Sequence, residues 1–400
     1  MVASADSSRQ SWLDWLRALA IFMVLTSHFP IAWGDAGLFL PLAAFNARLG
    51  WSGVDLFFVI SGFLIGGMLI GEEDRYGTVG LRNFYARRVL KIWPLLYLTA
   101  ILYVPAQVFL FGMPAGEALV RIAPAFFHIQ NYVQPEAMGH LWSLAVEEHF
   151  YLALPPIMLL AAWTSRRFRI GLPYFLLAAI IVVIVWRQYA VFVADVYPQR
   201  ARVLTHLRID GLLFGVLLAW VYRHRPALWL ATTGSKALLP ATLLLLAWPF
   251  AFNPNSSLIV AGPGFTSLYL GYGGLLMLVW RWVQRPLPRV LVEPLGRLAA
   301  IGRHSYPIYL FHPFVGYFFV AIGVGRSDTP LVLFGSESAT WLAGFVVFNT
   351  LAVGAGMAIG HYAEQPLLAL RNRLVPPRIA ALPDGSKPAA LEPVGTKIAV

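Results

Sequence analysis

The chain has 400 residues, of which 58% are hydrophobic and only 12% are charged, and its formal net charge is +11. Soluble domains contain about 25% charged residues, so this composition excludes a soluble globular protein and indicates a protein embedded in lipid. The absence of cysteine excludes disulfides, thiolate metal sites and a cysteine nucleophile. Because the basic residues lie mostly in short segments between apolar runs, we ascribe the positive charge to membrane topology and expect no nucleic-acid partner.

Ten apolar runs are long enough for helices that cross a bilayer, which takes about 20 residues per crossing. We predict an all-α polytopic bundle with spans near 15–33, 52–71, 92–112, 141–162, 171–193, 205–222, 237–251, 265–280, 305–323 and 340–362. The first run is interpreted as a retained helix rather than a signal peptide, since a second long run follows it without a convincing cleavage site. A shorter stretch, 117–131, carries charges and a proline, and we expect it to be re-entrant or interfacial.

The distribution of Lys and Arg orients the predicted bundle. With both termini in the cytoplasm, the inner segments hold 22 basic residues and the outer loops hold five, as the positive-inside rule requires. We expect residues 1–373 to form the transmembrane domain. The remainder, 374–400, is rich in Pro, Ala and Gly and is expected to be a flexible cytoplasmic tail.

The first predicted helix carries Arg17 and His28, and ionisable residues inside a membrane are costly enough to be candidates for function. Eleven residues make just over three turns, so both side chains leave nearly the same face, roughly 16 Å apart along the axis. Arg17 could hold phosphates near the cytoplasm, and His28 could move a proton further in. The pantetheine arm of coenzyme A has about the reach that would link them. The structural alternatives are that Arg17 extends to the interface and that His28 is a buried hydrogen-bonding residue.

Further ionisable residues share one depth in the outer half of the predicted bundle: Asp55, Glu147, Glu148, Arg187, His206, Arg208 and Asp210. A polar chamber would require such a common level, whereas scattered structural charges would not. Adjacent residues of a helix point about 100° apart, so at most one of the two glutamates can face His28. A carboxylate there would fix the tautomer of His28 and raise its basicity, which would allow His28 to deprotonate a sugar hydroxyl.

A basic cluster precedes the third predicted span on the cytoplasmic side. It contains Arg82, Arg87, Arg88 and Lys91. These residues could bind the nucleotide phosphates of coenzyme A, although positive-inside topology and contact with anionic lipid explain them equally well. The histidines are dispersed along the chain without metal-ligand spacing, so we expect no metal site.

Seven blocks, in order, resemble the membrane acyltransferase-3 family and together cover roughly residues 12–373. The most recognisable block runs from His140 to Leu152, where the family usually has glutamine in place of His149. The others are 13–18 leading to His28, then 53–64, 84–94, 208–211, 305–312 and 364–366. One block alone would be weak, but seven in the same order make the resemblance strong.

The resemblance implies a bacterial inner-membrane enzyme that O-acylates extracytoplasmic glycans, glycolipids or related acceptors. Acyl-CoA, acetyl-CoA foremost, would be a co-substrate, with no bound cofactor. It also implies that Arg17 is essential and that His28 is the catalytic base. Some members carry a fused esterase-like domain, which we do not expect here. We therefore assign catalysis to His28, Glu147, Glu148 and Asp55; coenzyme A binding to Arg17, Arg87, Arg88 and Lys91; and acceptor binding to Arg208, Asp210, His140 and Trp142.

A glycolipid transporter or flippase is the alternative, because intramembrane charges also mark transport pathways. Two features argue against it: the sequence shows no inverted repeat, and the spacing between Arg17 and His28 has no natural meaning in transport. Neither the acceptor, the acyl chain length nor the oligomeric state can be read from the sequence.

Overall fold

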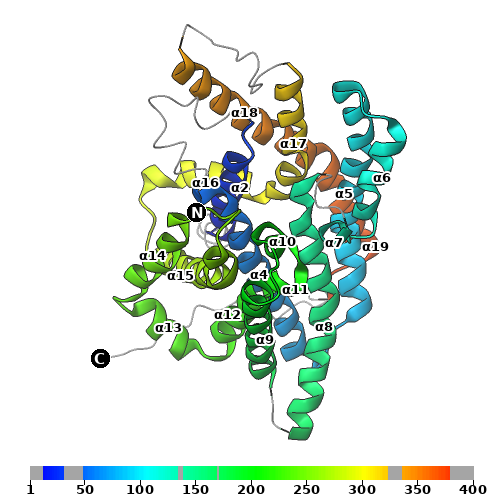
Figure 1. Cartoon of the computed structure of the whole chain (residues 1–400). Helices are drawn as coiled ribbons and strands as arrows, with labels where there is room; N and C mark the ends of the chain where they lie inside the picture. The colour runs from blue at the N-terminus through cyan, green and yellow to red at the C-terminus, as the bar shows by residue number, and fades with distance from the viewer. Residues whose placement is uncertain (1–11, 31–47, 134–137, 169–170, 323–335, 379–400) are drawn as a thin grey trace.

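The computed structural model describes residues 12–30, 48–133, 138–168, 171–322 and 336–378, and every regular element in these ranges is helical, as predicted (Figure 1). The first half of the chain forms α2 (Trp12–Ser27), α4 (Gly53–Tyr76), α5 (Leu81–Phe111), α6 (Ala115–Phe126), α7 (Gln130–Val133), α8 (Trp142–Phe168) and α9 (Leu172–Phe192). The second half forms α10 (Pro198–Val203), α11 (Thr205–Arg208), α12 (Asp210–His224), α13 (Pro226–Gly234), α14 (Leu238–Ala247), α15 (Phe265–Val283), α16 (Arg289–Arg303), α17 (Ser305–Ala321), α18 (Glu337–Ile359) and α19 (Gln365–Leu374).

Five helical stretches of the described chain are long and apolar enough to cross a membrane: Gly50–Tyr76, Leu81–Phe111, Gly139–Ser165, Leu172–Phe192 and Glu337–Leu374. A sixth is reached if Pro226–Gly234 and Leu238–Ala251, which are bent by 77°, form one broken span. The structure therefore supports a multi-pass membrane protein with five or six candidate spans.

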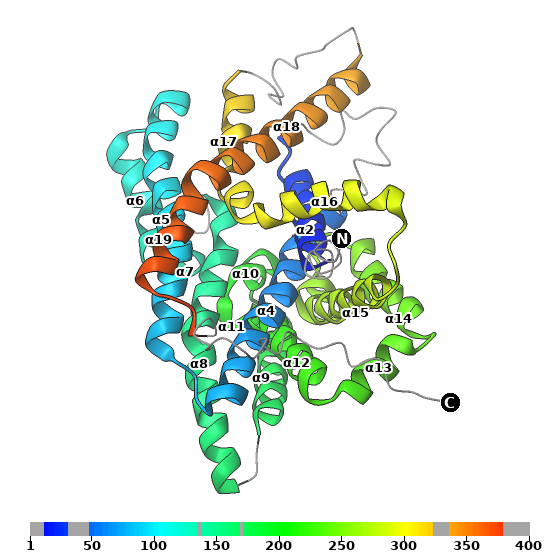
Figure 2. The same ribbon diagram turned by 180° about the vertical axis from the view of Figure 1, so that it is seen from behind.

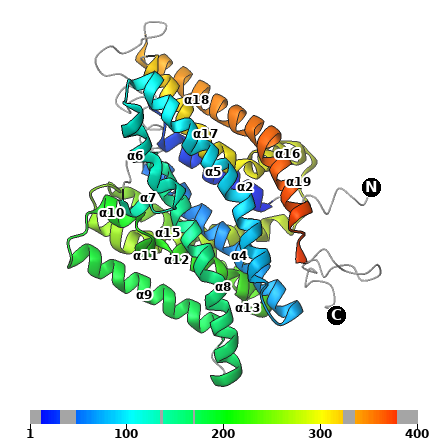
Figure 3. The ribbon, with the colours of Figure 1, turned by 90° about the vertical axis from the view of Figure 1, so that its right-hand side faces the viewer.

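The ten predicted spans are not confirmed, because four of the predicted segments form helices outside this set. Helix α2 has 16 residues and α17 has 17, fewer than the about 20 that a straight crossing takes. The segment 205–222 is divided between α11 and α12, and 265–280 lies in α15. The stretch 117–131, predicted not to span, contains most of α6, a helix of only 12 residues that packs beside α5, and the start of α7 (Figure 3).

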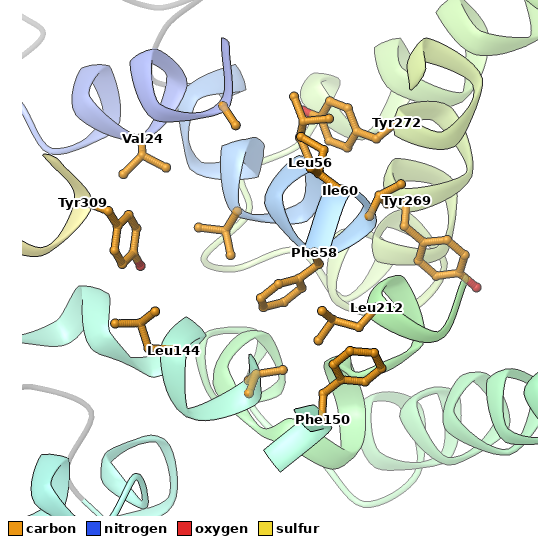
Figure 4. Packing of buried hydrophobic residues seen from close by; sticks show 14 of the residues in the cluster. Val24, Leu56, Phe58, Ile60, Leu144, Phe150, Leu212, Tyr269, Tyr272 and Tyr309 are labelled. Atoms are coloured by element: carbon orange, nitrogen blue, oxygen red, sulfur yellow. The ribbon is translucent and has the colours of Figure 1, made fainter. Parts of the chain in front are cut away.

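Helix α4 lies in the interior, with α2, α8, α12 and α15 packed around it (Figures 1 and 3). A helix that is apolar on all sides belongs in a core. Small residues allow the close packing of α4 on α12, because a Cβ on Gly62 would collide with the backbone oxygen of Leu212 on α12. Figure 4 shows Phe58 of α4 close to Leu212, and Tyr309 reaching from α17 toward Leu144 of α8.

Helix α16 lies within the predicted cytoplasmic segment 281–304 and crosses the first turn of α2 (Figure 2). The indole nitrogen of Trp15 donates to the carbonyl oxygen of Leu295 at 2.9 Å. Gly302 lies so close to Asp14 that a Cβ would collide with the Asp14 backbone. These contacts hold the Arg17 end of α2 against α16.

Candidate active site

His28 directly follows α2, the helix that also carries Arg17. Its ring nitrogen Nδ1 lies 2.9 Å from the carbonyl oxygen of Val24 and 3.2 Å from the hydroxyl oxygen of Ser27. A carbonyl oxygen only accepts hydrogen bonds, so in the neutral ring Nδ1 carries the hydrogen and Nε2 carries the lone pair. The backbone of α2 thus holds His28 in the tautomer that takes a proton through Nε2.

Two further histidines lie beside His28, although they are remote in sequence. The ring centroids of His28 and His312 are 4.9 Å apart, and those of His312 and His140 are 5.2 Å apart. Both added rings are buried, and among the described residues no hydrogen-bond partner reaches their Nε2 atoms. The histidines are dispersed along the sequence, but the packing of α2, α17 and the turn before α8 gathers three of them in space.

Tyr309 ties this histidine cluster (His28, His140 and His312) together from α17. Its hydroxyl group donates to the carbonyl oxygen of His140 at 2.5 Å and lies 2.6 Å from the hydroxyl oxygen of Ser143. Its own carbonyl oxygen accepts a hydrogen bond from Nδ1 of His312 at 2.8 Å. One buried residue therefore positions the backbone of one histidine and the ring of another.

Two members of the histidine cluster, His28 and His140, line a cavity of about 760 Å³, a volume within the usual range of small-molecule sites. His28 is exposed to solvent and forms part of the wall, together with the largely buried His140 and Trp142. Arg200 and Arg202 also line the cavity. Three residues predicted for the site therefore share one cavity.

Glu147 and Glu148 lie further along α8 and do not contact His28. The hydroxyl groups of Tyr151 and Ser61 lie 2.5 and 3.4 Å from Glu147 Oε2, and the indole nitrogen of Trp93 donates to Glu148 at 3.1 Å. The predicted carboxylate partner is replaced by the carbonyl of Val24. The reason is distance. His140 lies in the cluster with His28, and Glu147 follows His140 by seven positions, which corresponds to about 10 Å along a helix.

Four of the other predicted polar residues form two buried ion pairs. Arg208 contacts Asp55 at 2.6 Å and Arg187 contacts Asp210 at 2.7 Å, with no side chain more than 4% exposed. The guanidinium of Arg208 also lies 3.7 Å from the ring centroid of Phe265. None of these residues lines the cavity. Asp55, Arg208 and Asp210 thus connect helices, and the structure does not place them at the cavity surface.

A second polar region surrounds Arg17 at the opposite end of α2. Arg17 pairs with Asp14 at 2.8 Å and keeps 30% of its side chain exposed. Lys91 on α5 interacts electrostatically with Arg88, Arg17 and the carboxylate of Glu364. Three cations from two distant segments therefore gather here, which is what a site for phosphate groups requires.

Arg87 has different neighbours from the other predicted coenzyme A ligands. It donates to the side-chain oxygen of Asn372 at 3.0 Å and to the carbonyl oxygen of Val375. Arg378 pairs with Glu72 at 2.7 Å. The C-terminal segment thus packs against the start of α5 and the end of α4 as far as Arg378, while 379–400, most of the predicted tail, lies outside the described residues.

His312 and Tyr309 were not predicted as site residues, although both lie in the block 305–312 that resembles the family. Their spacing of three places them on one side of a helix, which was the available signal. Arg202 and Arg200 lie in a segment predicted as an outer loop, where no pattern marked them. Their place beside His28 depends on how α10 packs.

Comparisons with known proteins point to one family of enzymes. The family model for the acyltransferase domain Acyl_transf_3 matches residues 10–359. A putative O-acetyltransferase of Staphylococcus aureus is 27% identical over 324 residues, which cover 75% of this chain and 49% of that protein. The peptidoglycan O-acetyltransferase OatA of Listeria monocytogenes is 27% identical over 323 residues, which cover 75% of this chain and 48% of that protein.

The chain spans about half the length of the curated relatives it matches, and no solved structure is significantly similar to it. The family match extends over most of the chain. It includes α2 with Arg17, the adjacent His28, the turn before α8 and the whole of α17. The resemblance seen in the sequence is therefore confirmed, and the chain belongs to the acyltransferase-3 family of membrane acyltransferases.

Proposed function

We propose that this acyltransferase moves an acyl group, acetyl in the first instance, from cytoplasmic acyl-CoA to a hydroxyl group of an extracytoplasmic glycan or glycolipid. The main support is the layout of α2. Arg17 gathers with Arg88 and Lys91 at one end, and His28 opens into a cavity at the other. The relatives named as O-acetyltransferases support oxygen as the acceptor atom and acetyl as the group.

In this proposal His28 is the general base of a direct transfer. Nε2 takes the proton of the acceptor hydroxyl, and the hydroxyl oxygen attacks the carbonyl carbon of the thioester. The new carbon–oxygen bond is kept and the carbon–sulfur bond breaks. The departing sulfur takes the proton from Nε2 of His28, so coenzyme A leaves as a thiol. The carbonyl of Val24 keeps accepting from Nδ1 throughout, so it stabilises the imidazolium that forms.

The donor would lie along α2. The cations around Arg17 would hold the phosphates of coenzyme A, because guanidinium and ammonium groups bind phosphate through charge-assisted hydrogen bonds. The pantetheine arm would cover the roughly 16 Å between Arg17 and His28. Donor and acceptor would then meet inside the bundle without either crossing the membrane completely.

The proposal includes the topology of ten spans with both termini in the cytoplasm of a bacterial cell. Helices α2, α12, α15 and α17 would complete the bundle as short spans. The 22 basic residues of the inner segments against five in the outer loops support this orientation.

Purified protein in lipid nanodiscs tests the role of His28 directly. The chain has no cysteine, so a thiol reagent measures released coenzyme A without a background from the protein. His28→Gln keeps a polar side chain of similar size but cannot act as a base, and we expect it to slow transfer by about 10²- to 10⁴-fold. His206→Gln is the matched control, because His206 is exposed and does not line the cavity.

Mass spectrometry of surface glycans and glycolipids identifies the acceptor in cells that express native protein or His28→Gln at equal levels. A mass increment of one acyl group that appears only with the native protein supports the proposal. An equal increment with both proteins would refute the role of His28. Movement of a glycolipid across liposomes without an acyl-CoA-dependent product would instead support a transporter.

A further inference from the structure

The cavity beside His28 carries two arginines that form no ion pair with a carboxylate of the described chain. Arg200 donates to the carbonyl oxygens of Asn131, at 3.4 Å, and of Tyr132. Arg202 donates to the side-chain oxygen of Asn255 at 3.2 Å. All of these acceptors are neutral, so the hydrogen bonds orient the guanidinium groups without cancelling their charge.

The nearby carboxylates are already neutralised by other arginines. Arg202 interacts electrostatically with Arg208 and Asp55, but Asp55 is paired with Arg208 at 2.6 Å. In the same way Arg187 is paired with Asp210. Among the described residues that line the cavity, Arg200 and Arg202 are therefore cations without a paired carboxylate.

The lining of the cavity has one sign of charge. Among its described lining residues Arg200 and Arg202 carry formal charges, and none is Asp or Glu. A concave site lined by one sign of charge concentrates ligands of the opposite sign. Tyr197, which is 78% exposed, adds an aromatic surface at the same cavity, and such a surface can cover the apolar face of a sugar ring.

We propose that the acceptor is anionic: it carries a carboxylate or phosphate group that Arg202 and Arg200 bind while His28 deprotonates a neighbouring hydroxyl group. This inference rests on the proposed function and names the substrate class of the same site. Guanidinium groups match both oxyanions through paired hydrogen bonds. A carboxylate and a phosphate would make the same contacts with Arg200 and Arg202. The choice between these two anions is therefore left to the experiment.

Three amphipathic probes separate charge from shape. Octyl glucuronide and its methyl ester expose the same ring hydroxyl groups and differ in one negative charge, and octyl glucoside 6-phosphate provides the phosphate form. Binding of each probe to the full chain in nanodiscs is measured together with coenzyme A release from acetyl-CoA. We expect at least one charged probe to bind about 10- to 100-fold more tightly than the ester, as one or more charge-assisted hydrogen bonds would produce.

Variants assign the preference to the arginines. Arg202→Gln should remove most of the preference for the charged probe, whereas Arg202→Lys should retain part of it because the charge remains. Arg121→Gln is the control, since Arg121 forms an exposed pair with Glu117 and does not line the cavity. It should leave the preference unchanged.

Three results would overturn the inference: equal binding of charged and neutral probes, no binding of any probe up to millimolar concentration, or an unchanged preference in a folded Arg202→Gln variant. If that variant lowers kcat equally on all probes while the preference stays, Arg202 acts on the reacting carbonyl and the inference also fails. Tight binding of a charged probe without any release of coenzyme A would refute the proposed function and leave the anion site standing.

Discussion

The ion pair between Asp55 and Arg208 tests whether a carboxylate predicted to be catalytic is structural instead. The two side chains are 2.6 Å apart and only 4% and 3% exposed. Asp55→Asn preserves the shape of the side chain and removes its charge. Two unit charges about 4 Å apart interact by about 4 kcal/mol at an effective dielectric constant of about 20, and stranding one member of a buried pair costs about 3–5 kcal/mol. We expect Asp55→Asn to lower the free energy of unfolding by a similar amount.

The chain contains a matched control for this prediction. Arg121 and Glu117 are also 2.6 Å apart, but their side chains are 40% and 46% exposed. Exposed pairs contribute about 0–1 kcal/mol, so Glu117→Gln should leave the unfolding free energy nearly unchanged. Denaturant unfolding in detergent micelles, followed by the fluorescence of the 14 tryptophans, compares both variants with the native protein.

A double variant separates charge from contact. Asp55→Asn combined with Arg208→Gln removes both charges, so it should be more stable than Asp55→Asn alone because no unpaired charge stays buried. The reasoning is refuted if Asp55→Asn costs no more than Glu117→Gln. It is also refuted if Asp55→Asn unfolds like the native protein but abolishes transfer, because Asp55 would then belong to the chemistry.

Two further predictions concern the packing of α4 and the donor site. Gly62→Ala should prevent normal packing of α4 on α12, because the added methyl group meets the carbonyl of Leu212. Gly67→Ala should be tolerated, because its methyl group makes an ordinary 3.8 Å contact. Equal thermal stability of the two variants would contradict this prediction. Lys91→Gln should raise KM for acyl-CoA about tenfold with little change in kcat, since a charge-assisted hydrogen bond to phosphate contributes about 1.5–3 kcal/mol, and a loss confined to kcat would contradict the placement of phosphates there.

The positions of the apolar helices could be predicted from local sequence, but the number of helices that span the membrane could not. Apolar runs produced helices at every predicted position within the described chain. Hydropathy does not show where a helix ends, as the division of 205–222 at Ile209 illustrates. Helix α16 was missed because its residues 289–303 mix apolar and charged positions, and the contact with α2 that orders it is remote in sequence.

The sequence singled out those candidate site residues that are unusual in their own segment. Arg17 and His28 stand out because hydrocarbon makes an ionisable group costly wherever it occurs. Their partners did not stand out in the same way. The carbonyl of Val24 leaves no trace in side-chain patterns, and the ring of His312 approaches His28 from 284 positions along the chain.

The sequence by itself determined the membrane environment, the helical architecture and the identity of the residues that could carry chemistry, because each of these follows from local composition and from the cost of burying charge. Only the tertiary structure decided how those residues are used. Asp55 and Asp210 neutralise arginines, and Glu147 and Glu148 face other neighbours. Three histidines pack together, and two of them, His28 and His140, line one cavity. The physical reason is that the neighbours of a side chain depend on how whole helices rotate and cross. Packing across the entire bundle sets that geometry, and the spacing within a single helix does not.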